Sequence, residues 1–387
     1  MKETAYDRRR TADTGGHVPA DRRLPPAVYL DNNATTRVVD EVLSAMEPFY
    51  RELYGNAHAA HALGRRAHEA VEEARSSVAT LLDCDASEVI FTSCGTEGNA
   101  LVIRGLLDAH PTRRKVVTTA VEHPSVMRLL RALESRGEVE LAIAKVDSSG
   151  ALDLDQMRTL IDDRTLLVTA MLAQNETGVI HPIAEIARMA HAHGALLHVD
   201  AVQAAGKIAI SHEGVDFITI SGHKFHAPKG VGALTIRRGL KLMPLWYGGG
   251  QELGLRSGTE PVPSIVGLGV AARLALDSLP AFECVRELRD RFESELLSRR
   301  DVQIAGATQP RLPNTSSVIF RDNAAEVAMA LDREGICVSA GAACNSGRLD
   351  PSDTMQAMGL PAAVRFSLSR YTTPAEVDRA LAIIGAA

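Results

Sequence analysis

The middle of the chain alternates short apolar runs with segments in which apolar residues recur every three or four positions. Such runs predict buried strands, and the periodic segments between them predict helices. The expected strands are Val89–Thr92, Lys115–Thr119, Leu166–Met171, Ala195–Val199 and Phe217–Ile220. The expected helices are Glu97–Leu107, Pro124–Ser135 and Ile183–Ala192. This alternation predicts an α/β fold with a mostly parallel sheet that is covered by helices on both faces.

The pattern changes after about residue 280 and predicts a second, smaller α+β domain. Its expected elements are a charged helix over Phe282–Ser298, then Ser316–Phe320, Ala324–Arg333, Val364–Leu368 and Pro374–Ile384. We expect a large domain over residues 39–280 and a small domain made of residues 28–38 and 281–387. Residues 1–27 are poor in large apolar residues, so we expect a disordered tail there. The cleft between two domains is a common place for a ligand.

Composition narrows the class of protein. The chain has 387 residues, of which 45% are hydrophobic and 23% charged, as in ordinary globular proteins. The net charge of −6 argues against nucleic acid as a direct partner. Neither a membrane-length apolar run nor a secretory leader is seen, so we expect no membrane association and a cytoplasmic location. The five scattered cysteines predict a reactive thiol rather than a disulfide framework or a thiolate zinc site.

Polar residues follow three of the expected strands, where ligands bind in sheets of this kind. Gly95 and Thr96 open a helix and could bind a phosphate, although most such turns are only helix caps. Asp200, followed by Gln203, could hold a protonated pyridine nitrogen or simply cap a helix. Lys224 could form a Schiff base, although single lysines are usually solvated. Together the three groups match the parts that pyridoxal 5'-phosphate requires.

Longer motifs extend this pattern over residues 28–387. They are Tyr29–Thr36, Phe91–Asn99, Glu122-His123, Gln174–Val179, His198–Lys207, Ser221–Gly230, Gly248–Pro261 and Arg365–Thr373. In these motifs the chain resembles the cysteine desulfurases of the NifS/IscS type, which are pyridoxal phosphate enzymes of the class-V aminotransferase-like group. The resemblance implies fold type I, with a mostly parallel seven-stranded sheet in the large domain.

The resemblance also implies roles for the residues around the cofactor ring. Lys224 would carry the cofactor, Asp200 would hold the pyridine nitrogen, and Gln203 would hydrogen-bond the phenolic oxygen. His123 would stack on the ring and move protons. Asn175 would contact both the cofactor and the substrate.

Further roles concern the phosphate and the substrate. The resemblance implies that the phosphate is bound by Gly95, Thr96, Ser221 and His223. Thr259 would reach the phosphate of a neighbouring subunit, so a homodimer is expected. The substrate carboxylate would be held by Asn33, Asn175 and Arg365. An arginine suits this role because its planar fork matches a carboxylate.

The sulfur acceptor implied by the resemblance is Cys344. It lies among small and polar residues, which predicts a flexible loop rather than a packed interior cysteine. The expected reaction converts L-cysteine to L-alanine and leaves a persulfide on Cys344, for delivery to a protein acceptor in iron–sulfur cluster, tRNA or other thio-compound synthesis. A selenocysteine lyase and a catalytically silent partner-binding scaffold are alternatives. Lys224, Cys344 and Arg365 together argue against the scaffold.

Two other patterns are interpreted without a special function. His191, His193 and His198 resemble a metal cluster, but a helix end followed by a strand would separate them, so no metal site is expected. The charged run over residues 65–75 predicts the solvated face of an amphipathic helix.

Overall fold

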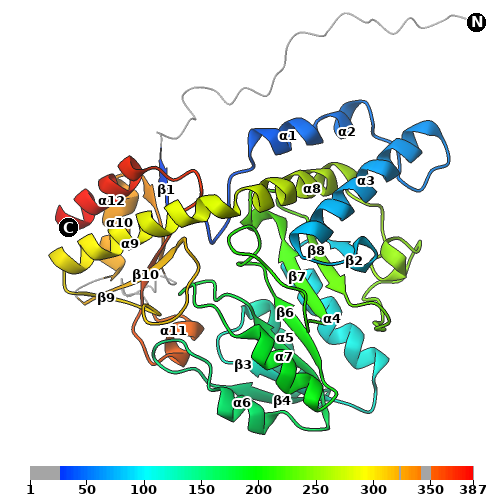
Figure 1. Cartoon of the computed structure of the whole chain (residues 1–387), viewed down its shortest axis with the longest axis horizontal. Coiled ribbons are helices and arrows are strands. Elements are labelled where there is room, and N and C mark those ends of the chain that lie inside the picture. Colours follow the sequence, from blue (N-terminus) through cyan, green and yellow to red (C-terminus); the bar gives the residue numbers. More distant parts are fainter. Residues whose placement is uncertain (1–26, 322–323, 341–349, 387) are drawn as a thin grey trace, which may run out of the picture.

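The computed structural model describes residues 27–321, 324–340 and 350–386. The expected tail, apart from residue 27, therefore lies outside the described residues. A seven-stranded sheet with the order β2-β8-β7-β6-β5-β3-β4 forms the centre of the larger part (Figure 1). Its strands are β2 (Val89–Thr92), β3 (Lys115–Thr119), β4 (Glu140–Ala144), β5 (Thr165–Met171), β6 (Leu196–Asp200), β7 (Phe217–Ser221) and β8 (Gly232–Ile236). β8 runs in the direction opposite to the other six strands, which are all parallel to one another.

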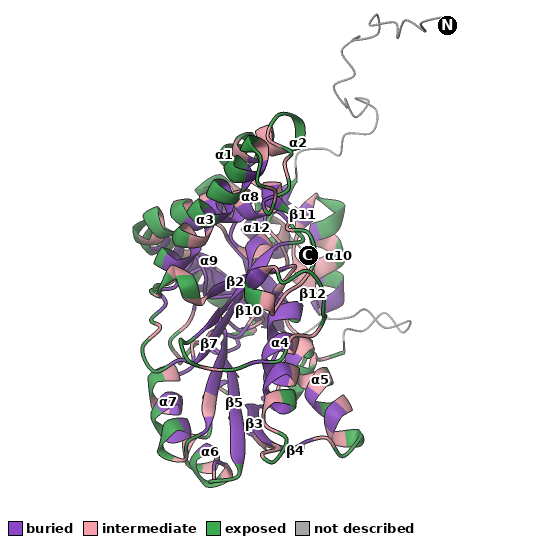
Figure 2. Cartoon of the chain, turned by 90° about the vertical axis from the view of Figure 1, so that its right-hand side faces the viewer, coloured by how far each residue is buried: buried purple, intermediate pink, exposed green. Residues whose placement is uncertain are grey.

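Helices cover both faces of this sheet, so its strands are buried in the interior (Figure 2). On one face lie α4 (Gly95–Ala109) and α5 (Pro124–Ser135). On the other lie α3 (Ala62–Leu81), α6 (Leu154–Leu160), α7 (Ile183–Ala192) and α8 (Val262–Asp277), and α1 (Asp40–Met46) packs against α8. Adjacent strand residues enter opposite cores, as Ile90 and Phe91 do, because side chains alternate along a strand. The predicted α/β fold class is confirmed.

The C-terminal part contains a four-stranded antiparallel sheet with the order β12-β13-β10-β9. Its strands are β9 (Val302–Ile304), β10 (Thr315–Phe320), β12 (Ser339–Ala340) and β13 (Val364–Ser367), and its helices are α9 (Phe282–Arg299), α10 (Ala324–Arg333), α11 (Asp353–Ala357) and α12 (Pro374–Ala386). The N-terminal strand β1 (Val28–Tyr29) pairs in parallel with β11 (Ile336–Cys337). Val28 and Leu30 pack into the hydrophobic cluster of this part. That packing agrees with the expected small domain, whose boundaries stay a prediction.

Short helices complete the described structure. They are α2 (Pro48–Arg51) and the single-turn 3-10 helices η2 (Ala86–Glu88), η3 (Gly222–Lys224), η4 (Glu252–Gly254) and η5 (Leu279–Ala281). The strand β7 passes directly into η3, where a Cβ on Gly222 would lie 2.9 Å from side-chain atoms of Ala227 and Leu268. This turn therefore requires a glycine, and it delivers Lys224 to the end of the sheet.

One sequence interpretation is corrected by the packing of α3. The run over residues 65–75 does lie on this helix, but Arg75 is not on a solvated face. Its guanidinium makes two 2.8 Å hydrogen bonds to the carboxylate of Glu252, whose side chain is almost fully buried. A buried carboxylate requires such a partner, and burial of the pair overrode the amphipathic pattern.

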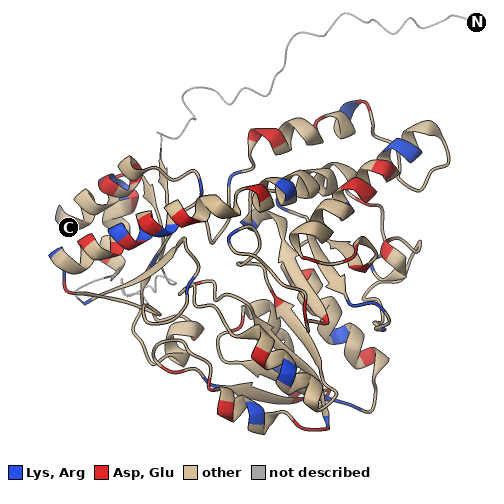
Figure 3. Cartoon of the chain, in the orientation of Figure 1, with Lys and Arg blue, Asp and Glu red and all other residues tan. Residues whose placement is uncertain are grey.

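Charged residues of both signs are interspersed over the outer helices (Figure 3). In the part of the chain that the structure describes, no single helix is long and apolar enough to cross a membrane. The segments Val262–Asp277 and Leu279–Arg299 reach the length and apolar composition of a membrane span only when they are taken together, and the chain bends by 55° between them.

Candidate functional site

A cavity of about 240 Å³ lies at the carboxyl ends of the parallel strands. The main-sheet loops contribute most of its wall, while Asn33 and Ala34 come from the N-terminal segment and Arg365 comes from β13. The lining residues that the sequence predicted are Asn33, Gly95, Thr96, His123, Asn175, Asp200, Gln203, Ser221, His223, Lys224 and Arg365. The fold thus brings together residues separated by more than 300 positions in the sequence.

The N-terminus of α4 forms one wall of the cavity. Its first residues, Gly95 and Thr96, present the free backbone N–H groups that begin every helix. A Cβ on Gly95 would lie only 2.7 Å from Cγ2 of Val202, so a glycine keeps this turn close to the segment after β6. Ser221 and His223 line the same cavity from the end of β7. This combination of N–H and hydroxyl donors is suited to an anion.

His223 is held as a neutral ring beside this wall. Burial, followed by the positive charges of Lys224 and other lysines, lowers the pKa of His223 to about 4. Its Nδ1 lies 3.1 Å from Oγ1 of Thr35, and its backbone oxygen accepts hydrogen bonds from the N–H and hydroxyl of Thr36. At neutral pH this imidazole therefore offers a hydrogen bond without adding charge.

Asp200 ends the central strand β6 and is almost completely buried. Its Oδ1 accepts a hydrogen bond from the N–H of Val202 at 3.0 Å, and its Oδ2 accepts one from Nδ2 of Asn99 at 2.8 Å. A buried carboxyl held in this way retains lone pairs that can accept a hydrogen bond from a cationic N–H in the cavity.

The amine of Lys224 has a pKa well below that of an ordinary lysine. Its Nζ donates to the backbone oxygens of Asn33 at 2.6 Å and Ala34 at 2.9 Å. Burial, followed by the charge of Arg365, lowers the pKa of Lys224 to about 8, and the carboxylates of Asp200 and Asp31 oppose this shift. An amine with such a pKa is neutral in a useful fraction of molecules near pH 7, as a nucleophilic lysine must be.

Arg365 closes the side of the cavity that faces the C-terminal sheet. Its Nη1 donates to the backbone oxygen of Asn175 at 2.9 Å, and its Nη2 forms a 2.8 Å ion pair with Asp31. The third nitrogen, Nε, is buried without a hydrogen-bond partner among the described residues. A buried N–H without a partner is costly, so this edge of the guanidinium is prepared for an acceptor.

The side-chain amides of Asn33 and Gln203, which were predicted to bind ligands, already make hydrogen bonds within the protein. The Asn33 amide donates to Oγ1 of Thr315, and its Oδ1 accepts from Asn314 and Lys207. Gln203 donates from Nε2 to the backbone oxygen of Asn33. A bond from either amide to a ligand would therefore replace one that exists here, and the two ligand-binding roles stay predictions.

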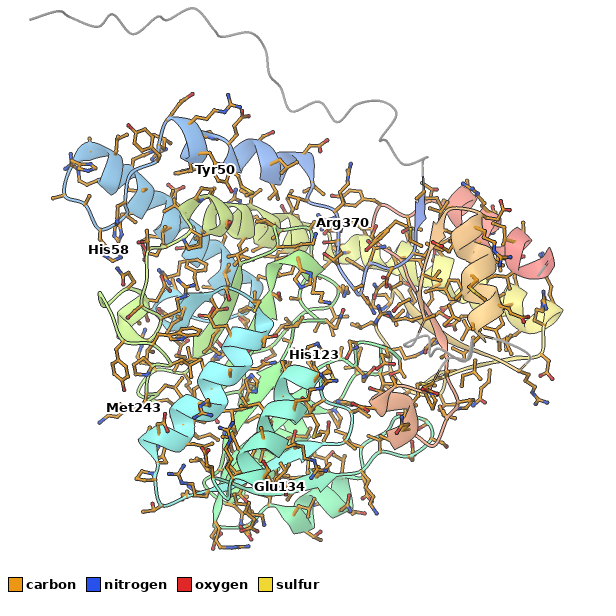
Figure 4. The ribbon with its side chains drawn as sticks, turned by 180° about the vertical axis from the view of Figure 1, so that it is seen from behind. Tyr50, His58, His123, Glu134, Met243 and Arg370 are labelled. Atoms are coloured by element: carbon orange, nitrogen blue, oxygen red, sulfur yellow. The ribbon has the colours of Figure 1, made fainter. Side chains whose placement is uncertain are left out.

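His123 lies at the start of α5, where its residue is exposed (Figure 4). It is the N-cap of this helix, and its Nδ1 accepts a hydrogen bond from the N–H of Ser125 at 3.1 Å. Burial and the charge of Lys224 lower the pKa of His123, while Asp200 opposes the shift. The ring is therefore predominantly neutral near pH 7 and able to exchange a proton.

Two predicted residues lie away from the described cavity wall. Thr259 is exposed in the segment between η4 and α8, so its role toward a neighbouring subunit stays a prediction. Cys344 lies outside the described residues. On one side of its segment, Ser339 pairs with Arg365; on the other, the Ser352 hydroxyl donates to Oε2 of Glu176 at 2.5 Å. Both flanking anchors thus join elements that carry cavity residues.

Several residues near the cavity had no role in the sequence interpretation. Asn99 and Ser125 bridge Asp200 and His123 by hydrogen bonds. Lys207 is buried beneath the cavity and donates to Oε1 of Gln203 at 2.7 Å. Asn99 and Lys207 lie within quoted motifs, but only the packing reveals what they contact.

The three histidines of the apparent metal pattern have separate partners. His191 lies 3.0 Å from Asp216, His193 lies 2.9 Å from Asp163, and His198 lies between the hydroxyls of Thr169 and Thr219. Among the residues that the structure describes, no group of three or more His, Cys, Asp or Glu side chains could hold a metal ion.

Comparison with known proteins agrees with this architecture. Residues 28–380 match the aminotransferase class-V family. A cysteine desulfurase of Nostoc sp. is 47% identical over 367 residues, which cover 92% of each chain. A solved NifS-like protein superposes with a TM-score of 0.87 at 39% identity, covering 93% of this chain and 99% of that one. SspA, solved in complex with cysteine, gives a TM-score of 0.77 at 32% identity over 89% of this chain and 99% of its own. With a match this long and a shared fold, the chain belongs to the aminotransferase class-V family.

Proposed function

We propose that this chain is a cysteine desulfurase that uses pyridoxal 5'-phosphate and transfers sulfur from L-cysteine to Cys344. The observation that carries the proposal is one cavity that combines the low-pKa amine of Lys224, the buried carboxyl of Asp200 and the unpartnered Nε of Arg365. The cysteine desulfurase of Nostoc sp. and the cysteine complex of SspA support the choice of activity and substrate.

The donor set fits pyridoxal phosphate in three places. The helix N-terminus at Gly95 and Thr96, with Ser221 and His223, supplies donors for a phosphate. Asp200 supplies an acceptor for a protonated pyridine nitrogen, and Lys224 supplies an amine for a covalent link. The three groups line a single cavity, so one ligand could contact all of them.

When bound, the cofactor supplies an electron sink for the bonds that are broken at the substrate. Lys224, with its lowered pKa, would remove and return the proton at the substrate Cα. His123, which lines the same cavity, would hold or deliver a proton. Arg365 would hold the substrate carboxylate through Nε, which orients the substrate side chain.

The sulfur transfer is balanced without an external oxidant or reductant. The thiolate of Cys344 would attack the substrate sulfur, a sulfur–sulfur bond would form, and the Cβ–S bond would break. A proton would then replace sulfur at Cβ, so L-cysteine and the Cys344 thiol would give L-alanine and a Cys344 persulfide. A protein acceptor would take up this sulfur. The proposal includes a homodimer, in which the exposed Thr259 of one subunit would reach the phosphate bound by the other.

Incubation of the purified, cofactor-loaded chain with L-cysteine tests the proposal. We expect L-alanine to accumulate, together with an equal amount of sulfide when a thiol reductant releases the persulfide. A parallel assay with L-selenocysteine distinguishes a selenocysteine lyase, which would release alanine from that substrate alone. A loaded chain that releases no alanine from L-cysteine would refute the proposed function.

A further inference from the structure

A continuous chain of hydrogen bonds connects Asp200 to His123 along one wall of the cavity. Nδ2 of Asn99 lies 2.8 Å from Oδ2 of Asp200 and 2.9 Å from Oγ of Ser125. Oγ of Ser125 lies 2.7 Å from Nδ1 of His123. Asn99 is buried on the second turn of α4, and Ser125 lies on the first turn of α5, so two helices hold the chain in place.

The chemistry of the groups sets the direction of each bond. A carboxylate only accepts hydrogen bonds, so the Asn99 amide must turn its NH₂ group toward Asp200. The same nitrogen lies within hydrogen-bond distance of Oγ of Ser125, so its second proton is donated to that oxygen. The other amide atom, Oδ1, is buried without a partner among the described residues. The Ser125 oxygen thus accepts from Asn99, and its own proton is free to point to Nδ1 of His123.

Nδ1 of His123 consequently faces two donors from one residue, the hydroxyl and the backbone N–H of Ser125. A ring nitrogen that accepts hydrogen bonds carries no proton, so the proton of the neutral imidazole must lie on Nε2. Nε2 makes no hydrogen bond to any residue within the described ranges, and the ring lines the cavity.

We infer that Ser125 is a positioning residue that holds His123 as the Nε2–H tautomer, and that Asn99 sets the direction in which Ser125 acts. The inference deepens the proposed function, since it assigns the proton offered to a bound substrate to Nε2. It also couples the proton on His123 to Asp200 through Asn99. The other charged group that acts on His123 is Lys224.

Nuclear magnetic resonance of the full chain, with isotope-labelled histidine, tests the tautomer directly. The His123 signal is assigned by its loss in His123→Gln, and spectra are recorded with and without the cofactor. We expect the nitrogen shifts of an Nε2–H ring near neutral pH in both states. An Nδ1–H ring in the native chain would overturn the inference, whether or not the chain desulfurates cysteine. Failure of alanine release with an Nε2–H ring would overturn only the proposed function.

Variants at Ser125 separate positioning from mere packing. Ser125→Ala removes one donor to the neutral ring, so the midpoint of the His123 titration should rise by about half to one pH unit. Ser125→Thr retains the hydroxyl and should restore the native midpoint. Ser135→Ala, which removes an exposed hydroxyl from the other end of α5, is the matched control and should not move it. An unchanged midpoint in Ser125→Ala would overturn the role of the hydroxyl.

The direction-setting role of Asn99 is tested by a double-mutant cycle. In Asn99→Leu the Ser125 hydroxyl is no longer oriented by a donor. Adding Ser125→Ala in that background should therefore raise the midpoint less than it does in the native chain. Equal increases in the two backgrounds would show that Ser125 acts without Asn99 and would overturn that part of the inference.

Discussion

Replacement of Arg365 by methionine or by lysine should separate its two effects on the site. Methionine removes both the charge and the fork, whereas lysine retains the charge and loses the fork. In the structure two guanidinium nitrogens are occupied by Asn175 and Asp31, and Nε is left for a substrate carboxylate. The variants therefore differ in electrostatics but share the loss of that donor.

The size of the effect follows from the missing hydrogen bond. A hydrogen bond to a charged group contributes about 1.5–3 kcal/mol, which corresponds to roughly a 10- to 150-fold change in binding. Steady-state assay of alanine release should show a fall of this size in kcat/KM for L-cysteine in Arg365→Lys. A kcat/KM within about twofold of the native value would refute the proposed contact with the carboxylate.

The effect of the lost charge on the pKa of Lys224 should appear in Arg365→Met and not in Arg365→Lys. Because Arg365 lowers the pKa of Lys224, Arg365→Met should raise that pKa above about 8, and Arg365→Lys should leave it nearly unchanged. The pH dependence of cofactor loading, followed by visible absorbance, would shift upward only in the methionine variant. Asp31→Asn is the matched control for kcat/KM, because it breaks the ion pair but retains Arg365; since Asp31 raises the pKa of Lys224, this variant should lower that pKa. A change of kcat/KM in this control as large as in Arg365→Lys would point to lost packing instead.

Three further predictions concern other parts of the site. Lys224→Ala should lose the covalent cofactor link, so a borohydride-stabilised adduct on a different lysine would contradict the assignment. Cys344→Ser should load the cofactor and bind L-cysteine yet lose alanine release, because a hydroxyl is a far poorer nucleophile than a thiolate. In the native enzyme, mass spectrometry should find one extra sulfur on the peptide that contains Cys344. An extra sulfur on Cys94 would count against the mechanism. Thr259→Ala should weaken phosphate retention in a homodimer, and sedimentation of a fully active monomer would rule out a shared site.

The elements that the sequence predicted well are those with clear physical boundaries. The helix Pro124–Ser135 was predicted with the ends that the structure gives, since a proline favours the first helical position. Strands β4 and β8 had no place in the prediction. In β4 burial is incomplete, and β8 lies close to glycines and charged residues that dilute its apolar pattern.

In the site, residues that follow a strand could be predicted from the local sequence, whereas contacts between distant segments could not. Lys224 and Asp200 could be predicted because each follows a recognisable strand. The contacts of Asn99 with Ser125 could not be predicted, because they depend on how two helices pack on one face of the sheet. The buried pair of Arg75 and Glu252 joins residues 177 positions apart, and no local pattern predicts it.

The pairing of β1 with β11 has a consequence for the order in which the protein is made. Lys224 rests on the carbonyl oxygens of Asn33 and Ala34, and that segment is itself held by Asn314, Thr315 and Ser367. On the ribosome, residues 28–38 emerge long before Asn314, Thr315 and Ser367, which hold them in the folded chain. The N-terminal segment must therefore wait while the central sheet folds, and closing so long a loop is slow. A nascent chain that ends before β13 would lack Arg365 and Ser367, so the cavity around Lys224 is completed only after β13 has been made.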